Sequence, residues 1–150
     1  MILLDCMNKK IKNARELTIN NIHFKSKLEA NFYKTLLQYK LNVQYEPKKF
    51  TLIEGFTPTI PFYNRNSNKE FIKDMRKVRA ITYTPDFIVY YKKAMFIIEG
   101  KGVENDVFPL KKKLFRRLLE TIDIPCFYFE VRTKKELLEV ISIIKSYEIT

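Results

Sequence analysis

Histidine, cysteine and long apolar runs are scarce in this chain of 150 residues, and each scarcity argues against a class of protein. With one histidine, His23, an active site built on histidine is not expected. Cys6 and Cys126 lie far apart and lack the spacing of zinc ligands, which favours a reducing, cytoplasmic setting without a zinc site. No stretch approaches the roughly 18 apolar residues of a membrane span, so we expect no membrane partner.

Basic residues are abundant. The chain carries 28 Lys and Arg against 17 Asp and Glu, for a formal net charge of +11. Such an excess favours a polyanionic partner such as nucleic acid, although a generic basic surface explains the charge equally well. An apolar share of 46% indicates a folded domain with a core, and the length suits one domain over residues 1–150.

The order of the expected elements predicts an α/β fold, in which a mixed sheet is flanked by helices. Two capping-box patterns, Ser26 to Glu29 and Thr133 to Glu136, mark the starts of helices. We expect helices over 26–40, 108–121 and 133–146, and strands over 43–46, 50–53, 84–91, 94–99 and 126–131. Residues 1–21 form a basic arm or a short helix, and 54–79 form a loop or insertion.

Two carboxylates and an amine are the chemically distinctive residues. A tight hairpin centred on Lys92-Lys93 pairs residues whose numbers sum to 185, and so sets Asp86 opposite Glu99. Opposed side chains have Cβ atoms about 4.5–5.5 Å apart, and two carboxylates there repel unless a cation or proton lies between them. Mg²⁺ or Mn²⁺ suits oxygen ligands. Lys101 shares the face of Glu99 because side chains alternate along a strand. Lys-Lys is not a favoured two-residue turn, so this register is a hypothesis.

Each of these residues also has a structural explanation. Asp86 follows a proline and could cap a turn. Glu99 could mark the exit of an apolar strand, with Lys101 as its surface partner. The glutamate of a capping box commonly binds the first amide of its helix, and this gives Glu29 a structural role. We expect Cys126 and most Phe and Tyr residues in the core, and we find no aromatic platform of the kind that single-strand binders use.

Four blocks in order resemble a known family. They are 23–29, 83–87, 98–102 and 108–115, which contain Glu29, then Asp86, then Glu99-x-Lys101. The set is similar to the PD-(D/E)XK nuclease superfamily, and closer to a phage-borne domain family of nominally unknown function, similar to the endonuclease I type of Holliday-junction resolvase. The resemblance implies a restriction-endonuclease-like core and, for a phage-encoded protein, the cytoplasm of the host.

The resemblance also implies roles. Glu29, Asp86 and Glu99 would bind Mg²⁺, with Mn²⁺ as a substitute and the Gly100 carbonyl as a further ligand, while Lys101 would activate or orient water. The enzyme would be a metal-dependent DNA endonuclease, selective for branched DNA such as Holliday junctions, and a homodimer. The basic residues expected to contact nucleic acid are Lys25, Lys27, Lys111, Lys112, Lys113 and Arg116.

Two alternatives stay open. The chain could be a non-catalytic module of the same fold that binds nucleic acid or protein, with its carboxylates as remnants. It could also be a sequence-specific restriction enzyme, for which residues 54–79 are the only candidate recognition element.

Overall fold

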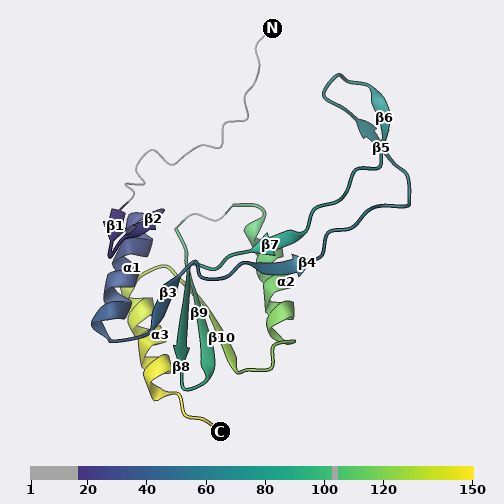
Figure 1. The fold of residues 1–150 in the computed structure, drawn as a ribbon. Coiled ribbons are helices and arrows are strands. Elements are labelled where there is room, and N and C mark those ends of the chain that lie inside the picture. The colour runs from purple at the N-terminus through teal and green to yellow at the C-terminus, as the bar shows by residue number, and fades with distance from the viewer. Residues whose placement is uncertain (1–16, 103–104) are drawn as a thin grey trace. The chain divides into compact units, whose positions relative to one another are not determined.

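The protein is described here from a computed structural model, which covers residues 17–102 and 105–150 and contains three helices and ten strands in those ranges (Figure 1). Their order is β1 (Leu17–Ile19), β2 (Ile22–Phe24), α1 (Lys27–Gln38), β3 (Val43–Tyr45), β4 (Phe50–Ile53), β5 (Phe62–Arg65), β6 (Phe71–Asp74), β7 (Ile81–Tyr83), β8 (Phe87–Tyr91), β9 (Ala94–Gly100), α2 (Phe108–Leu119), β10 (Cys126–Val131) and α3 (Lys134–Ser146).

The chain divides into two compact units. The first, here called the sheet unit, comprises the described parts of Met1–Pro47, Pro85–Glu104 and Asp123–Thr150. The second, the ribbon unit, comprises Lys48–Thr84 and Asn105–Ile122. Each is described by itself below.

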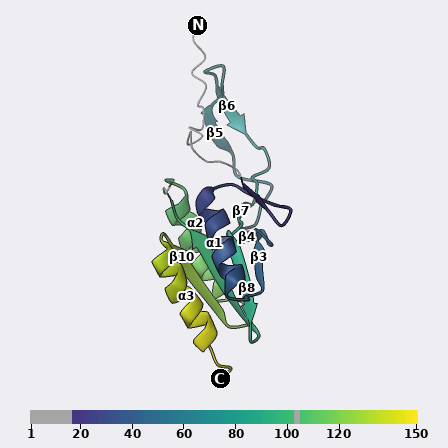
Figure 2. The same ribbon diagram turned by 90° about the vertical axis from the view of Figure 1, so that its left-hand side faces the viewer.

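A four-stranded mixed sheet is the centre of the sheet unit. Its order is β10-β9-β8-β3, in which β10 and β9 run parallel and the other neighbours run antiparallel. Helices α1 and α3 cover the same face of this sheet (Figure 2) and bury Phe32, Leu36, Leu137 and Ile144 against it. The predicted mixed sheet flanked by helices is therefore confirmed.

Side-chain caps define where α1 and α3 begin. The Ser26 hydroxyl accepts a hydrogen bond from the Glu29 amide at the start of α1, and the Thr133–Glu136 pair forms a complete capping box at the start of α3. Helix α1 ends with Lys40 at a φ of 56°, where the amides of Lys40 and Leu41 bond the carbonyls of Leu37 and Leu36. This is a Schellman ending with lysine in the place that glycine usually takes.

The turn between β8 and β9 joins the two strands whose register determines the predicted site. Tyr91 pairs with Ala94 and Phe87 with Ile98, so the expected sum of 185 is confirmed. Lys92 and Lys93 adopt φ values of 45° and 63°, the left-handed pair that a type I′ turn requires. An unfavoured dipeptide thus occupies a tight turn, because the strands on either side are deeply buried and determine the pairing.

Aromatic packing joins the elements of the ribbon unit. Strands β4 and β7 pair antiparallel, and α2 packs on them with Phe115 fully buried. The Phe115 ring lies 5.0 Å from that of Phe50 and 4.7 Å from that of Tyr83, in edge-to-face arrangements. Leu110, near the start of the same helix, is 57% exposed.

The segment 54–79, expected to be a loop or insertion, contains two paired strands. Beyond a bridge between Phe56 and Val78, β5 and β6 form a two-stranded antiparallel ribbon. A Cβ on Gly55 would lie 2.8 Å from the Val78 carbonyl oxygen, so glycine permits the two chains to approach where they leave the β4–β7 ladder. Figures 1 and 2 show the ribbon extending away from α2.

Other boundaries differ from expectation. The strand predicted over 84–91 begins at Phe87, after Pro85 and Asp86. Residues 17–24, part of which fell in the predicted arm or helix, form the β1–β2 hairpin; 1–16, including Cys6, lie outside the described residues. Cys126 is half-buried instead of fully in the core, because it begins an edge strand. Within the described ranges, no helix is long and apolar enough to cross a membrane.

The left-handed turn leads to a stability prediction. Lys93→Gly removes the Cβ that opposes a φ of 63° and is expected to raise the free energy of unfolding by about 1 kcal/mol. Lys93→Ala is the matched control, because it removes the same charge and keeps the Cβ. Urea denaturation measures both. If both variants raise the free energy of unfolding equally, the effect comes from loss of the lysine side chain and not from the backbone.

Candidate functional site

Asp86 and Glu99 are joined by reciprocal contacts between carboxylate and backbone. The Glu99 carboxylate accepts from the Asp86 amide at 3.4 Å, and the Asp86 carboxylate accepts from the Gly100 amide at 2.8 Å. Asp86 precedes the first residue of β8, where the ladder ends, so its amide has a side chain as partner in place of a strand. The hairpin therefore brings together two acidic residues that are 13 positions apart.

Gly100 provides room for the Asp86 carboxylate. A Cβ at this position would lie 3.3 Å from Asp86 Oδ2 and 3.4 Å from the Phe32 ring. A side chain there would force the carboxylate or the ring to shift, and the short bond to the Gly100 amide would lengthen. The glycine matters for its size, since its φ is not in the left-handed region.

Lys101 lies next to this pair and is only 8% exposed, while Glu99 is 9% exposed. The Lys101 amide donates to the Val131 carbonyl at 2.7 Å, so the β9–β10 ladder continues through this residue. Side chains therefore still alternate at Lys101, which places Lys101 and Glu99 on the same side of the strand. The low exposure of Lys101 and Glu99 differs from the exposed ion pair that the sequence also allowed.

Glu29 approaches the pair from α1 but is held by hydroxyls. One carboxylate oxygen accepts from the Ser26 hydroxyl at 2.9 Å and the other from the Tyr45 hydroxyl at 2.5 Å. The capping box predicted here is thus half formed, since only the Ser26 side chain binds a backbone amide. Burial and the bond to Glu29 raise the pKa of Tyr45, which keeps its phenol protonated as a donor.

The sequence analysis missed Glu46 and Tyr45. The Glu46 amide donates to the Asp86 carbonyl at 2.7 Å, and its carboxylate pairs with Lys25. Glu46 has a φ of 42°, an unusual conformation for a residue with a side chain. A carboxylate at the end of the predicted strand 43–46 was the available signal. Lys25, whose contact with nucleic acid stays a prediction, pairs with this carboxylate and keeps most of its side chain exposed.

Crowded negative charge defines the electrostatics of the site. Burial, then the charges of Glu99 and Glu29, raise the pKa of Asp86 from 3.8 to about 8. The Glu46 pair raises the pKa of Lys25, and the charges of Glu29 and Asp86 add to this. At neutral pH the cluster therefore holds a proton that a bound cation would displace.

The donor set suits a hard divalent cation. Mg²⁺ is commonly held by one or two carboxylates while it keeps several waters, and Asp86 with Glu99 supplies two carboxylates beside the Gly100 backbone. Among residues 17–102 and 105–150, no three Asp, Glu, His or Cys side chains are grouped closely enough to hold a metal ion. Asp86 and Glu99 are thus brought together as expected, whereas a third carboxylate ligand from Glu29 remains a prediction.

The other basic residues singled out from the sequence are distributed over both units. Lys27 is exposed at the first position of α1 in the sheet unit. The remaining four, Lys111, Lys112, Lys113 and Arg116, lie on α2 in the ribbon unit. Lys112 Nζ lies 5.6 Å from the centre of the Phe108 ring, and Lys113 and Arg116 are exposed. Their contact with nucleic acid stays a prediction.

A family model matches residues 9–137, most of the chain. The protein belongs to the DUF1064 family. Its description is that of a protein of unknown function, so membership of DUF1064 assigns no activity. No curated protein and no solved structure matches the chain.

The raised pKa of Asp86 predicts how stability depends on pH. The folded protein retains a proton that the unfolded chain releases near pH 4, so the free energy of unfolding falls as the pH rises from about 4 to about 8. Asp86→Asn lacks this titration and should gain stability over wild type across that window, by a few kcal/mol. Thermal unfolding in EDTA measures the difference.

Asp74→Asn is the control with opposite sign. Hydrogen bonds from Arg76 lower the pKa of Asp74, so this variant loses a stabilising charge above pH 4. A gain for Asp86→Asn that does not grow with pH would contradict the assignment of the buried proton.

Proposed function

We propose that the protein is a divalent-metal-dependent DNA endonuclease that hydrolyses phosphodiester bonds. The supporting observation is the reciprocal pairing of Asp86 with Glu99, with a buried Lys101 two residues further on. Two carboxylates suit a cation, and an adjacent amine suits the anionic phosphate. The order Asp, then Glu-x-Lys on one hairpin also resembles the PD-(D/E)XK nucleases, whose core this unit would share.

The proposed chemistry assigns each residue one task. Asp86 and Glu99 would hold Mg²⁺ or Mn²⁺, with Glu29 and the Gly100 carbonyl nearby. The cation, when bound, lowers the pKa of water and offsets charge on the phosphate. Lys101 would orient the attacking water or donate to a non-bridging oxygen. The water oxygen bonds to phosphorus, the bond to the 3′ oxygen breaks, and that oxygen takes a proton, which leaves a 5′-phosphate and a 3′-hydroxyl.

The substrate class follows from charge and from resemblance. A formal net charge of +11 favours a nucleic acid. Likeness to junction resolvases favours branched DNA and a homodimer, because two opposed strands must be cut. Lys27 and the basic residues of α2 would contact phosphates.

A non-catalytic DNA-binding module is the second candidate. It is favoured by the hydrogen bonds that occupy both Glu29 oxygens and by the absence of a three-carboxylate group among the described residues. Calorimetry with Mn²⁺ separates the two functions. Mn²⁺ binding that Asp86→Asn weakens supports the nuclease. No Mn²⁺ binding, together with DNA affinity that ignores EDTA, supports the module.

Cleavage of branched DNA tests the proposal directly. Wild type with Mg²⁺ should cut a four-way junction or a flap faster than linear duplex. Glu99→Gln and Lys101→Met should each slow cleavage by at least about 100-fold, the usual effect of losing one preorganised electrostatic contact. The measurement is the single-turnover rate on end-labelled substrates.

Glu139→Gln is the matched control, because Glu139 is exposed on α3 and outside the cluster. Its rate should equal that of wild type. If wild type, Glu99→Gln and Lys101→Met all cut equally, or none cuts any branched substrate with Mg²⁺ or Mn²⁺, the proposed nuclease is rejected.

A further inference from the structure

The β5–β6 ribbon carries an unusual concentration of exposed large apolar side chains. Half of those exposed in the described residues lie between 53 and 78: Ile53, Phe56, Ile60, Phe62, Tyr63, Phe71, Ile72, Met75 and Val78. Exposed apolar side chains gathered on one segment are typical of an interaction site. The same segment is basic, because residues 54–79 hold six Lys and Arg against three Asp and Glu.

The register of the ribbon sorts these residues into two different faces. Tyr63 pairs with Lys73 and Arg65 with Phe71, so alternation places these four side chains together. We call this set, Tyr63, Arg65, Phe71 and Lys73, the aromatic-basic face. The opposite face carries Phe62, Asn64, Ile72 and Asp74.

On the aromatic-basic face each cross-strand pair joins one ring to one cation. The Tyr63 and Phe71 rings are stacked, with centroids 6.0 Å apart and planes 22° apart. Tyr63 is 53% exposed and Phe71 77% exposed, and Arg65 and Lys73 are exposed as well. The face contains no acidic side chain. It is an aromatic platform that the sequence analysis did not detect, because pairing across the turn creates it.

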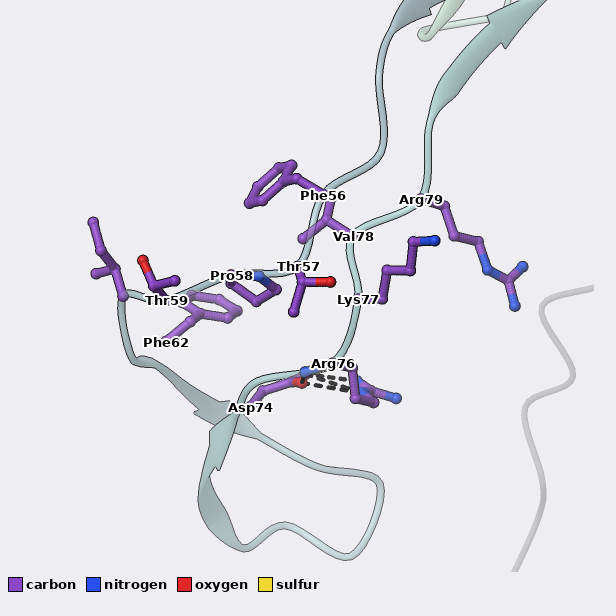
Figure 3. Close-up of a pocket in the computed structure, with 11 residues that line it drawn as sticks. Phe56, Thr57, Pro58, Thr59, Phe62, Asp74, Arg76, Lys77, Val78 and Arg79 are labelled. Carbon is purple, nitrogen blue, oxygen red and sulfur yellow. Dashed lines mark hydrogen bonds and ion pairs between the residues drawn. The ribbon is translucent and has the colours of Figure 1, made fainter.

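Among the paired residues 62–65 and 71–74, the one acidic side chain, Asp74, lies on the opposite face. Asp74 is bonded there by Arg76, with Nη2 and Oδ2 2.7 Å apart, and by the Asn64 amide. Phe62 and Asp74 also line an open pocket of about 1170 Å³ at the base of the ribbon (Figure 3).

We propose that the aromatic-basic face of the β5–β6 ribbon binds unpaired nucleotides of DNA. Exposed rings stack on bases of any sequence, and adjacent cations neutralise the phosphates between them. Charge complementarity favours this partner over the same face of a second copy, whose exposed Arg65 and Lys73 would repel it. This inference rests on the proposed function, because unpaired strands are a feature of branched substrates that the nuclease would bind.

Binding in EDTA tests the face without cleavage. Fluorescence anisotropy with a labelled single strand and a blunt duplex compares wild type with Tyr63→Ala and Phe71→Ala. Loss of one stacked base costs about tenfold in affinity, so each variant should bind the single strand about tenfold more weakly, with a smaller change for the duplex.

The cations have a separate signature. Arg65→Gln with Lys73→Gln removes two phosphate contacts, and the slope of log affinity against log salt should become shallower by about 1.4 on single strands. Lys134→Gln with Lys135→Gln, which removes two exposed charges from α3, should leave the slope nearly unchanged.

Phe62→Ala with Ile72→Ala is the matched control for the opposite face of the ribbon. It removes exposed apolar side chains from the same two strands and should bind single strands as wild type does. Equal loss in this control, no loss in either ring variant, or a loss on duplex alone would overturn the proposal. The proposal would also be overturned if sedimentation showed that the ring variants lose DNA only because a dimer dissociates.

Failure of this inference and failure of the nuclease are distinguishable. If wild type cuts with Mg²⁺ and the ring variants bind single strands normally, the proposed nuclease stands and the proposed role of the aromatic-basic face is rejected. If wild type never cuts and the ring variants lose single-strand affinity in EDTA, the proposed nuclease is rejected and the role of the face stands.

Discussion

The candidate site depends on one pairing, that of β8 with β9. Shifting either strand by one residue would move Asp86 to the face opposite Glu99 and Lys101, which stay together because they are two residues apart on one strand. The buried residues Val89, Phe96 and Ile98 oppose such a shift, since it would undo their packing in the core with residues of α1 and α3. Hydrophobic burial in the sheet unit thus provides the force that keeps two carboxylates together against their repulsion. Burial, and then the repulsion from Glu99, raise the pKa of Asp86.

The surroundings of this pair show how a small sheet can hold charge inside. Backbone amides, which carry partial positive charge and cannot move away, bind Asp86 and Glu99 at the end of the ladder. Hydroxyls serve Glu29 in the same way, and Lys25 serves Glu46. Every acidic side chain of the cluster therefore has a donor supplied by a neighbouring element, so the arrangement is built by the fold and not by a single loop.

The features that could be predicted from the sequence are those that local residue chemistry determines. Serine and threonine caps located α1 and α3, and a continuous apolar run located β9 and, through the sum of 185, its register with β8. The β5–β6 ribbon within 54–79 was not predicted because its residues are mostly exposed on both faces, so no alternation of buried and polar side chains marked its strands. Glu46 and Tyr45 were missed for another reason: their contacts with Asp86 and Glu29 join segments that only tertiary folding brings together.

The exposed ribbon also affects how the protein behaves in concentrated solution. A two-stranded sheet has two outer edges, and those of β5 and β6 are flanked by large apolar side chains without a covering helix. Such edges can add strands from neighbouring molecules, and mutual charge repulsion is what keeps those molecules apart. Dissolved ions weaken that repulsion. The protein should therefore aggregate least in dilute buffer, and pairing of strand edges between molecules should increase as ionic strength rises.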